Sequence, residues 1–276
     1  MSKNIVRLLM DTIPGDIENY LLSFLTKAEL FVLLFTSKRF MTLVKKRGKI
    51  CPDIELLDSN LSLLVWARSK NIPWNNYNLR RPSFRGDLPL IKWALSNGCK
   101  FNDNISYYAS YNGHIHLLEW IRENYYHNDW ICYYAAQGYQ LETLKWLRKH
   151  RYPWDACVCA ASACNFKQLK WIRGNGCPWD VSTFNAAVKC GNTKIFRWLK
   201  EQKCPWDTST CAAACPDSLI WLRENNCPWD QETTYNAVIE NDLQKLKWAI
   251  SNGCPWNKQQ CSLIAKGKVL AWINSQ

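Results

Sequence analysis

Apolar and basic positions recur with a helical period along the chain, and residues 194–200 illustrate the pattern. At 100° per residue, the apolar side chains of this segment fall within an arc of about 160°, and the basic side chains lie on the other side. The apolar residues are Ile195, Phe196, Trp198 and Leu199, and the basic residues are Lys194, Arg197 and Lys200. The pattern predicts a short amphipathic helix, which we call helix B.

A second short helix, called helix A, is predicted just before helix B. Pro178 holds Cys177 in an extended conformation, and Asp180 is a good N-cap for a helix that runs to about Lys189. A turn then leads into helix B. Small residues recur at one position of helix A, which would let neighbouring helices approach closely. They are Ala109, Ala135, Ser162, Ala187, Ala214 and Ala237.

The tryptophans show that this helical hairpin is repeated. One column of residues lies in helix B: Trp66, Trp93, Trp120, Trp146, Trp171, Trp198, Trp221, Trp248 and Trp272. A second column lies in the loop before helix A: Trp74, Phe101, His127, Trp154, Trp179, Trp206, Trp229 and Trp256. Members of the first column are 23 to 27 residues apart. Single hairpins of this size are not stable alone, so they must stack.

We therefore predict an all-α fold, in which residues 51–276 form an α-solenoid of about eight stacked hairpins. The first copy is irregular, because Pro82 stands where helix A should run. The segment "YNGHIHLLEWIRENY" at 111–125 resembles the second half of an ankyrin repeat, with Gly113-His114 in the same register. The repeats are shorter than the ankyrin repeat of about 33 residues. The β-hairpin finger is therefore expected to be reduced or absent, as in similar arrays of large DNA viruses and some protists.

Residues 12–45, "TIPGDIENYLLSFLTKAELFVLLFTSKRFMTLVK", lie outside the repeat and resemble an F-box. We assign residues 1–50 to this domain. An F-box docks on the Skp1 adaptor of cullin-RING ubiquitin ligases. The resemblance implies a docking surface that comprises Ile13, Pro14, Ile17, Leu21, Leu22, Leu25, Leu30, Leu33, Leu34 and Phe40. The alternative is that these helices only cap the open end of the solenoid.

The formal net charge of +12 makes acidic partners plausible. No signal peptide is recognised, and the most apolar stretch, residues 21–35, contains Lys27 and Glu29 and is too short to span a bilayer. We expect an intracellular protein of the cytoplasm or nucleus, in the host cell if viral, with no membrane partner. Its fourteen Cys are then expected to stay reduced, and the loop cysteines to be packed free thiols.

No motif for catalysis, metal or cofactor binding is found. The cysteines are spread over the repeats rather than grouped as zinc ligands. None of the four His stands in register with a nucleophile, and phosphate-binding and dinucleotide-binding motifs are missing. We expect a protein that is not an enzyme and holds neither a metal nor a cofactor.

Two groups of residues are candidates for partner binding. Basic residues flank the helix B tryptophans and would form a ladder on the outside of the array: Lys145, Arg148, Lys170, Arg173, Arg197 and Lys200. This basic ladder is either a solvated face or a surface for nucleic acid or another acidic partner. Aromatic residues crowd two adjacent copies of helix A, and the candidates for target binding are Tyr107, Tyr111, Trp130, Tyr133 and Tyr139.

The most economical hypothesis is a non-enzymatic adaptor. The F-box would recruit a Skp1-cullin ubiquitin ligase, and the repeat array would bind a target protein for ubiquitination. Two alternatives remain open. One is a protein-interaction scaffold whose N-terminal helices only cap the array, and the other is a basic solenoid that binds nucleic acid.

Overall fold

The computed structural model describes residues 61–69, 74, 79–125 and 129–276. The chain forms two compact units, residues 1–108 and 109–276, which we describe separately. The F-box-like segment and all ten of its predicted docking residues lie outside the described residues, as does His127. The division between residues 1–50 and 51–276 therefore stays a prediction.

Residues 61–108 of the first unit contain helices α5 (Leu61–Ser69), α6 (Arg80–Arg85) and α7 (Leu88–Ser96), and the start of α8 (Asp103–Tyr111). The irregular sequence of this copy suggested that Pro82 would interrupt helix A. The structure shows that it does not. It is the third residue of α6 and is buried. Proline is tolerated there because the backbone N–H groups of the first helical turn have no partner within the helix.

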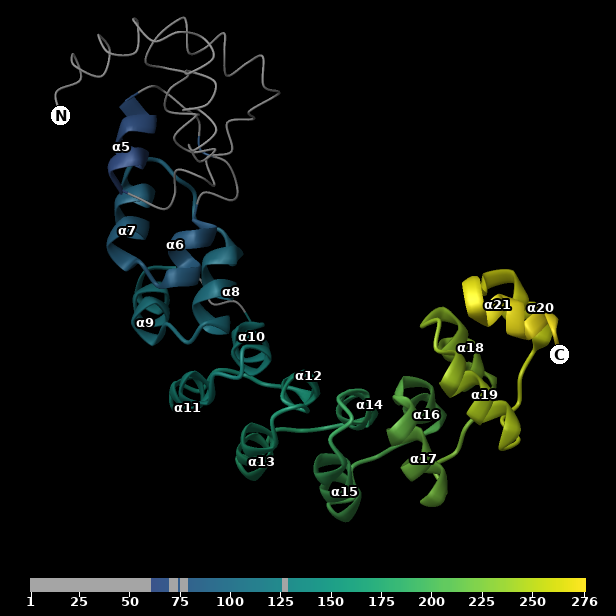
Figure 1. Cartoon of the computed structure of the whole chain (residues 1–276). Helices are drawn as coiled ribbons and strands as arrows, with labels where there is room; N and C mark the ends of the chain where they lie inside the picture. The colour runs from purple at the N-terminus through teal and green to yellow at the C-terminus, as the bar shows by residue number, and fades with distance from the viewer. Residues whose placement is uncertain (1–60, 70–73, 75–78, 126–128) are drawn as a thin grey trace, which may run out of the picture. The chain divides into compact units, whose positions relative to one another are not determined.

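The second unit alternates the two predicted kinds of helix (Figure 1). The helix A series comprises α10 (Ile131–Gln137), α12 (Ala156–Ala161), α14 (Val181–Lys189), α16 (Thr208–Ala213), α18 (Gln231–Ile239) and α20 (Lys258–Ile264). The helix B series comprises α9 (Ile115–Asn124), α11 (Leu141–Lys149), α13 (Phe166–Gly174), α15 (Thr193–Glu201), α17 (Pro216–Glu224), α19 (Leu243–Ser251) and α21 (Gly267–Asn274). The described residues contain helices and no strand, which confirms the all-α repeat fold and its eight hairpins, α6–α7 to α20–α21.

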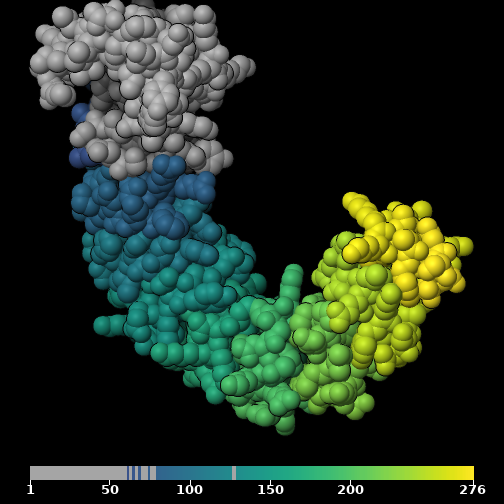
Figure 2. Space-filling model, viewed as in Figure 1, coloured from purple at the N-terminus to yellow at the C-terminus, as the bar shows by residue number. Residues whose placement is uncertain are grey.

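The helix A series packs closely along the second unit, α10 on α12, α12 on α14, and so on to α18. The predicted column of small residues is buried in this series, since Ala135, Ala187 and Ala237 have no exposed surface. Neighbouring B helices of this unit pack less closely than neighbouring A helices. Between α10 and α19 the A series therefore lies on the inside of a curve and the B series on the outside (Figure 1). In the space-filling view the surface of this unit is hollowed on the inner side (Figure 2).

The Cys-Pro-Trp-Asp turn links each repeat to the one before it. The Asp180 side chain accepts a hydrogen bond from the Ser182 backbone N–H at 2.9 Å, which confirms it as the N-cap of α14. The loop cysteine donates its S–H to the backbone carbonyl of the N-cap Asp in the preceding repeat. The pairs are Cys177–Asp155 at 3.2 Å, Cys204–Asp180 at 3.7 Å, Cys227–Asp207 at 3.6 Å and Cys254–Asp230 at 3.3 Å. The four cysteines are buried free thiols, as predicted.

The third residue of helix B provides another link between repeats, which the sequence pattern did not reveal. In three repeats its side chain donates a hydrogen bond to a backbone carbonyl of helix A in the preceding repeat. The bonds are Gln168–Ala136 at 2.8 Å, Ser218–Val188 at 2.8 Å and Lys245–Ala212 at 2.9 Å. Lys245 has no exposed side-chain surface and also pairs with Glu240 at 3.1 Å.

The expectation that every cysteine is reduced is wrong at one position. Cys164 and Cys190 form a disulfide, with their Cα atoms 5.8 Å apart. Both residues are exposed and lie in the turn that follows helix A, in consecutive repeats. The expectation rested on the cellular compartment, but the close packing of α12 on α14 brings the turns at their ends near enough for a bond.

Candidate functional site

The outer side of helix B carries a row of tryptophan pairs. In the last five repeats the loop Trp contacts the helix B Trp of the same hairpin, mostly edge to face. The ring centroids are separated by 6.1 Å for Trp154–Trp171, 5.8 Å for Trp179–Trp198, 6.2 Å for Trp206–Trp221, 6.0 Å for Trp229–Trp248 and 6.4 Å for Trp256–Trp272. All ten indoles are half-buried. Each pair joins the loop to helix B and leaves part of both rings at the surface.

A cation from the preceding repeat lies over each of four loop indoles. The distances from the charged group to the ring centroid are 4.5 Å for Arg148 over Trp154, 4.2 Å for Arg173 over Trp179, 5.3 Å for Lys200 over Trp206 and 4.1 Å for Arg223 over Trp229. In every case the cation comes six residues before the Trp. This constant spacing is visible in the sequence, but it does not show by itself that the two side chains touch.

These contacts change the interpretation of the basic ladder. All six of its residues lie on α11, α13 and α15, as predicted, and all but Arg173 are exposed. Arg148, Arg173 and Lys200 are nevertheless held against indoles rather than extended into solvent. Arg173 Nη1 also donates to the Cys177 carbonyl at 2.9 Å, and Lys200 Nζ donates to Asn225 Oδ1 at 2.7 Å. These side chains are therefore structural contacts and surface charges at once.

The ladder is part of a larger basic face. We use this name for the nine cations of α11, α13 and α15, which are the six ladder residues together with Lys149, Lys167 and Lys194. The same three helices carry only two carboxylates, Glu142 and Glu201. Within the described residues, Lys145 is the one member of the face that has a carboxylate within 4.0 Å, Glu142 at 2.7 Å. The face therefore holds a concentrated and largely uncompensated positive charge.

The aromatic candidates are distributed over two units. Tyr107 belongs to the first unit, and its ring centroid lies 4.7 Å from that of Tyr108. In the second unit, Trp130 contacts Tyr133, with centroids 5.7 Å apart. Trp130 is 51 % exposed and Tyr139 is 49 % exposed, so both offer large apolar surfaces to solvent.

The backbone explains why Tyr139 projects from the turn after α10. Its φ of 57° is left-handed, and Gly113 and Gly191 occupy the same turn position in other repeats with φ values of 78° and 70°. The preceding Gly138 is required by close packing, since a Cβ there would lie 1.9 Å from the carbonyl oxygen of Tyr111. The structure thus places Tyr111 beside this turn. A role of the aromatic residues in target binding stays a prediction.

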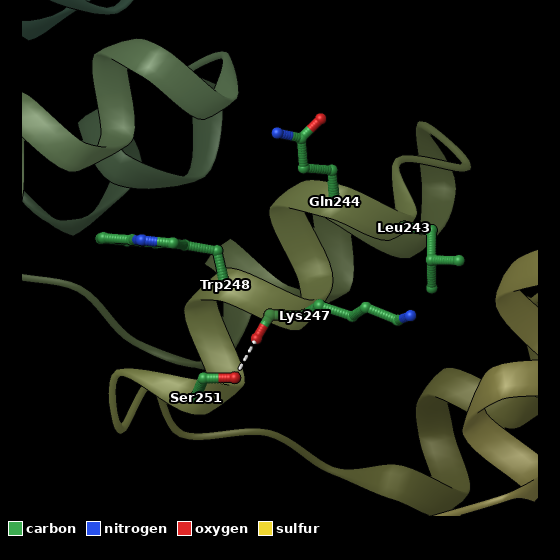
Figure 3. A pocket seen from close by; sticks show the side chains of 5 residues that line it. All are labelled: Leu243, Gln244, Lys247, Trp248 and Ser251. Atoms are coloured by element: carbon green, nitrogen blue, oxygen red, sulfur yellow. Dashed lines mark hydrogen bonds between the residues drawn. The ribbon is translucent and has the colours of Figure 1, made fainter.

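A shallow pocket of about 540 Å³ lies along α19 (Figure 3). It is lined by Leu243, Gln244, Lys247, Trp248 and Ser251. None of these five residues is among the partner-binding candidates predicted from the sequence. Lys247 lies over the Trp272 ring at 5.7 Å, and the Ser251 hydroxyl donates to the Lys247 carbonyl at 2.8 Å. One helix supplies the whole lining, so the pocket is an open contact surface rather than an enclosed cavity.

Metal ligands and reactive thiols are the features of the described residues that bear on catalysis. No three His, Cys, Asp or Glu side chains among them converge as metal ligands. Burial raises the pKa of the Cys132 and Cys204 thiols to about 12, which keeps them protonated and poorly nucleophilic at neutral pH. No helix of the described residues is long and apolar enough to cross a membrane.

Comparison with known proteins gives only a distant structural likeness. No protein-family model and no curated protein match the chain. Among solved structures, the pentatricopeptide repeat protein PPR10 in complex with an 18-nucleotide psaJ RNA element is similar at 12 % identity and a TM-score of 0.33. A triple cysteine-to-serine variant of PPR10 with the same RNA element gives the same values. The alignments cover 99 % of this chain and 53 % of PPR10, so the chain spans about half the length of the structures it matches.

Proposed function

We propose that this protein is a non-enzymatic adaptor, in which the repeat array binds a target protein and the N-terminal segment recruits a Skp1-like subunit of a cullin-RING ligase. One observation carries the proposal: an F-box-like sequence at 12–45 precedes a stack of helical hairpins in a single chain. Its mechanism is effective concentration, because a semi-rigid array brings a lysine of the target close to the ligase.

The array supports the target-binding half of the proposal. Stacked repeats give an extended surface whose exposed positions vary without loss of the fold. Trp130 and Tyr139 expose about half of their side chains, and aromatic side chains are enriched in interface hot spots. We propose that these two residues, with Tyr107, Tyr111 and Tyr133, contribute to target binding.

Capture by purified Skp1 tests the ligase half. The full chain is expected to bind immobilised Skp1, and the double substitution Pro14→Ala with Leu21→Asp is expected to abolish binding. Ile239→Asp is the matched control, because Ile239 is an apolar residue of the array that is 60 % exposed.

Failure of the unaltered chain to bind Skp1 removes the ligase role and favours a scaffold whose N-terminal helices only cap the array. In that case, deletion of residues 1–50 is expected to lower the urea midpoint of the array, since the deletion uncovers its first hairpin.

A further inference from the structure

The positive charge of the second unit is concentrated in its middle. The basic face of α11, α13 and α15 holds nine cations and two carboxylates, whereas residues 204–276 hold six cations and seven carboxylates. Helix A of the same repeats is almost uncharged: α10 and α12 have no charged residue, and α14 has only Lys189. One side of three consecutive repeats is therefore strongly basic.

Several cations of the face are held in place before any ligand binds. Arg148 stacks on Trp154 at 4.5 Å, and Lys170 Nζ lies 4.2 Å from the Phe166 ring. Arg173 is fixed from two sides, by the Trp179 ring at 4.2 Å and by the Cys177 carbonyl at 2.9 Å. A long cationic side chain loses conformational entropy when it binds an anion. Stacking removes part of that cost in advance and leaves the other guanidinium N–H groups available.

The indole contacts favour a carboxylate ligand over nucleic acid. Proteins that bind single-stranded nucleic acid use open aromatic ring faces on which the bases stack. Here the indoles of Trp146, Trp154, Trp179, Trp198 and Trp206 each have a cation over the ring. The face thus presents ordered cations surrounded by partly exposed indole surface. Such a surface is complementary to a ligand in which acidic side chains alternate with apolar ones.

We propose that the basic face of α11, α13 and α15 binds an extended acidic segment of a partner protein. Closely packed helices are about 8–10 Å apart, and neighbouring B helices pack less closely than that, so the outer axes of the three B helices are more than about 16–20 Å apart. An extended chain needs at least about six residues to cover this distance. The inference rests on the proposed function, since it specifies the chemistry of the target that the adaptor holds.

Fluorescence anisotropy with the full chain tests the inference. The probe is a fluorescein-labelled twelve-residue peptide of alternating Glu and Leu pairs, and the comparison ligand is oligouridylate of the same formal charge. The triple substitution Arg148→Glu, Lys170→Glu and Arg197→Glu is expected to weaken peptide binding at least about tenfold. The matched control is Lys258→Glu, Lys266→Glu and Lys268→Glu, which changes the net charge equally at exposed positions outside the face. It is expected to leave the affinity within about twofold.

Three results would overturn the inference: no binding of the peptide, equal weakening by the control triple, or tighter binding of oligouridylate than of the peptide, which would assign the face to nucleic acid. Should the triple reversal unfold the chain, Arg148→Lys with Arg197→Lys replaces it. These substitutions keep the charge and remove the guanidinium, and a loss of about threefold or more is expected. Binding of the Glu triple to Skp1 separates the two proposals, because that variant retains the F-box-like segment.

Discussion

The central segment of the array, residues 141–203, and the C-terminal segment, residues 204–276, have the same scaffold and different surfaces. Both contain loop and helix B tryptophan pairs, N-cap aspartates and buried loop cysteines. The central B helices carry nine cations. In the C-terminal segment, Ile220 replaces the cation before the helix B Trp of α17, and Ile250 replaces the cation two residues after that of α19.

The difference separates what makes the fold from what is free to vary. Contacts between repeats use the same positions in both segments, because each hairpin buries its apolar face only against its neighbours. Arg148, Arg173 and Lys200 of the central segment stack on indoles of the next repeat, and in the C-terminal segment Arg223 alone makes the same contact with a loop indole. The larger number of cations in the central segment is therefore not a requirement of the fold.

The largest expected effect concerns the shared core. Leu199 in α15 and Leu222 in α17 follow the helix B Trp and have no exposed surface. Substitution of either by Ala should lower the free energy of unfolding by about 2–5 kcal/mol, through lost burial and the cavity left behind. Urea unfolding monitored by circular dichroism measures this decrease in the free energy of unfolding. The neighbouring exposed substitution Arg197→Ala is the control, and an equal loss there would contradict the shared-scaffold comparison.

The second largest loss of stability is expected when a hydrogen bond between repeats is removed. Gln168→Leu in the central segment and Lys245→Met in the C-terminal segment each remove a donor from a backbone carbonyl of the preceding repeat. Each should cost about 1–3 kcal/mol, because the Ala212 carbonyl loses the Lys245 donor and the Ala136 carbonyl keeps only the Tyr139 N–H. Lys247→Met removes an exposed charge from the same helix as Lys245 and should be nearly neutral. Unchanged urea midpoints for both Gln168→Leu and Lys245→Met would show that these bonds do not join the repeats.

Alkaline pH should weaken both the contact between the two segments and the C-terminal segment itself. Burial raises the pKa of the Cys204 thiol from 9.0 to about 12 and that of Cys254 to about 11. The folded state therefore holds these protons more tightly than the unfolded state. The contribution of these thiols to the free energy of unfolding is fully present below pH 9. It is lost as the pH rises toward 11–12, by about 1.4 kcal/mol per thiol for one pH unit.

Urea midpoints at about pH 8 and about pH 10 measure this loss. Cys204→Ala should reduce the difference between the two midpoints through the contact of Cys204 with the Asp180 carbonyl of the central segment, and Cys254→Ala should reduce it within the C-terminal segment. Identical pH dependence of the substituted and unaltered chains would show that these thiols do not control alkaline stability.

The smallest effect is expected at the helix A caps. Asp180 accepts from the Ser182 N–H at 2.9 Å, and Asp230 accepts from the Glu232 N–H at 3.0 Å. Replacement of either by Ala should cost about 1 kcal/mol or less, since both caps are near the surface. Asp→Asn at the same positions keeps the acceptor and serves as the control. A loss at one cap and none at the other would break the equivalence of the two segments.

Much of the fold could be predicted from the sequence, because short helices with a repeated apolar face have few ways to pack. The spacing of the tryptophans predicted the hairpins, and Asp180 marked the start of α14. Pro82 was misleading, since its effect depends on its place within the helix rather than on its presence. The Cys164–Cys190 disulfide could not be predicted, because it depends on the separation of two turns that are 26 residues apart in the chain.

The sequence by itself determined the repeat, its helical hairpins, and the position of the basic ladder on helix B. Periodicity is a local property, and it fixes which side of a helix each residue occupies. Only the tertiary structure decided that Arg148, Arg173 and Lys200 lie over indoles of the next repeat, and that Gln168 and Lys245 reach back to the previous one. These contacts join residues of different hairpins, so they depend on how neighbouring repeats are placed, which the spacing of residues within one hairpin does not specify.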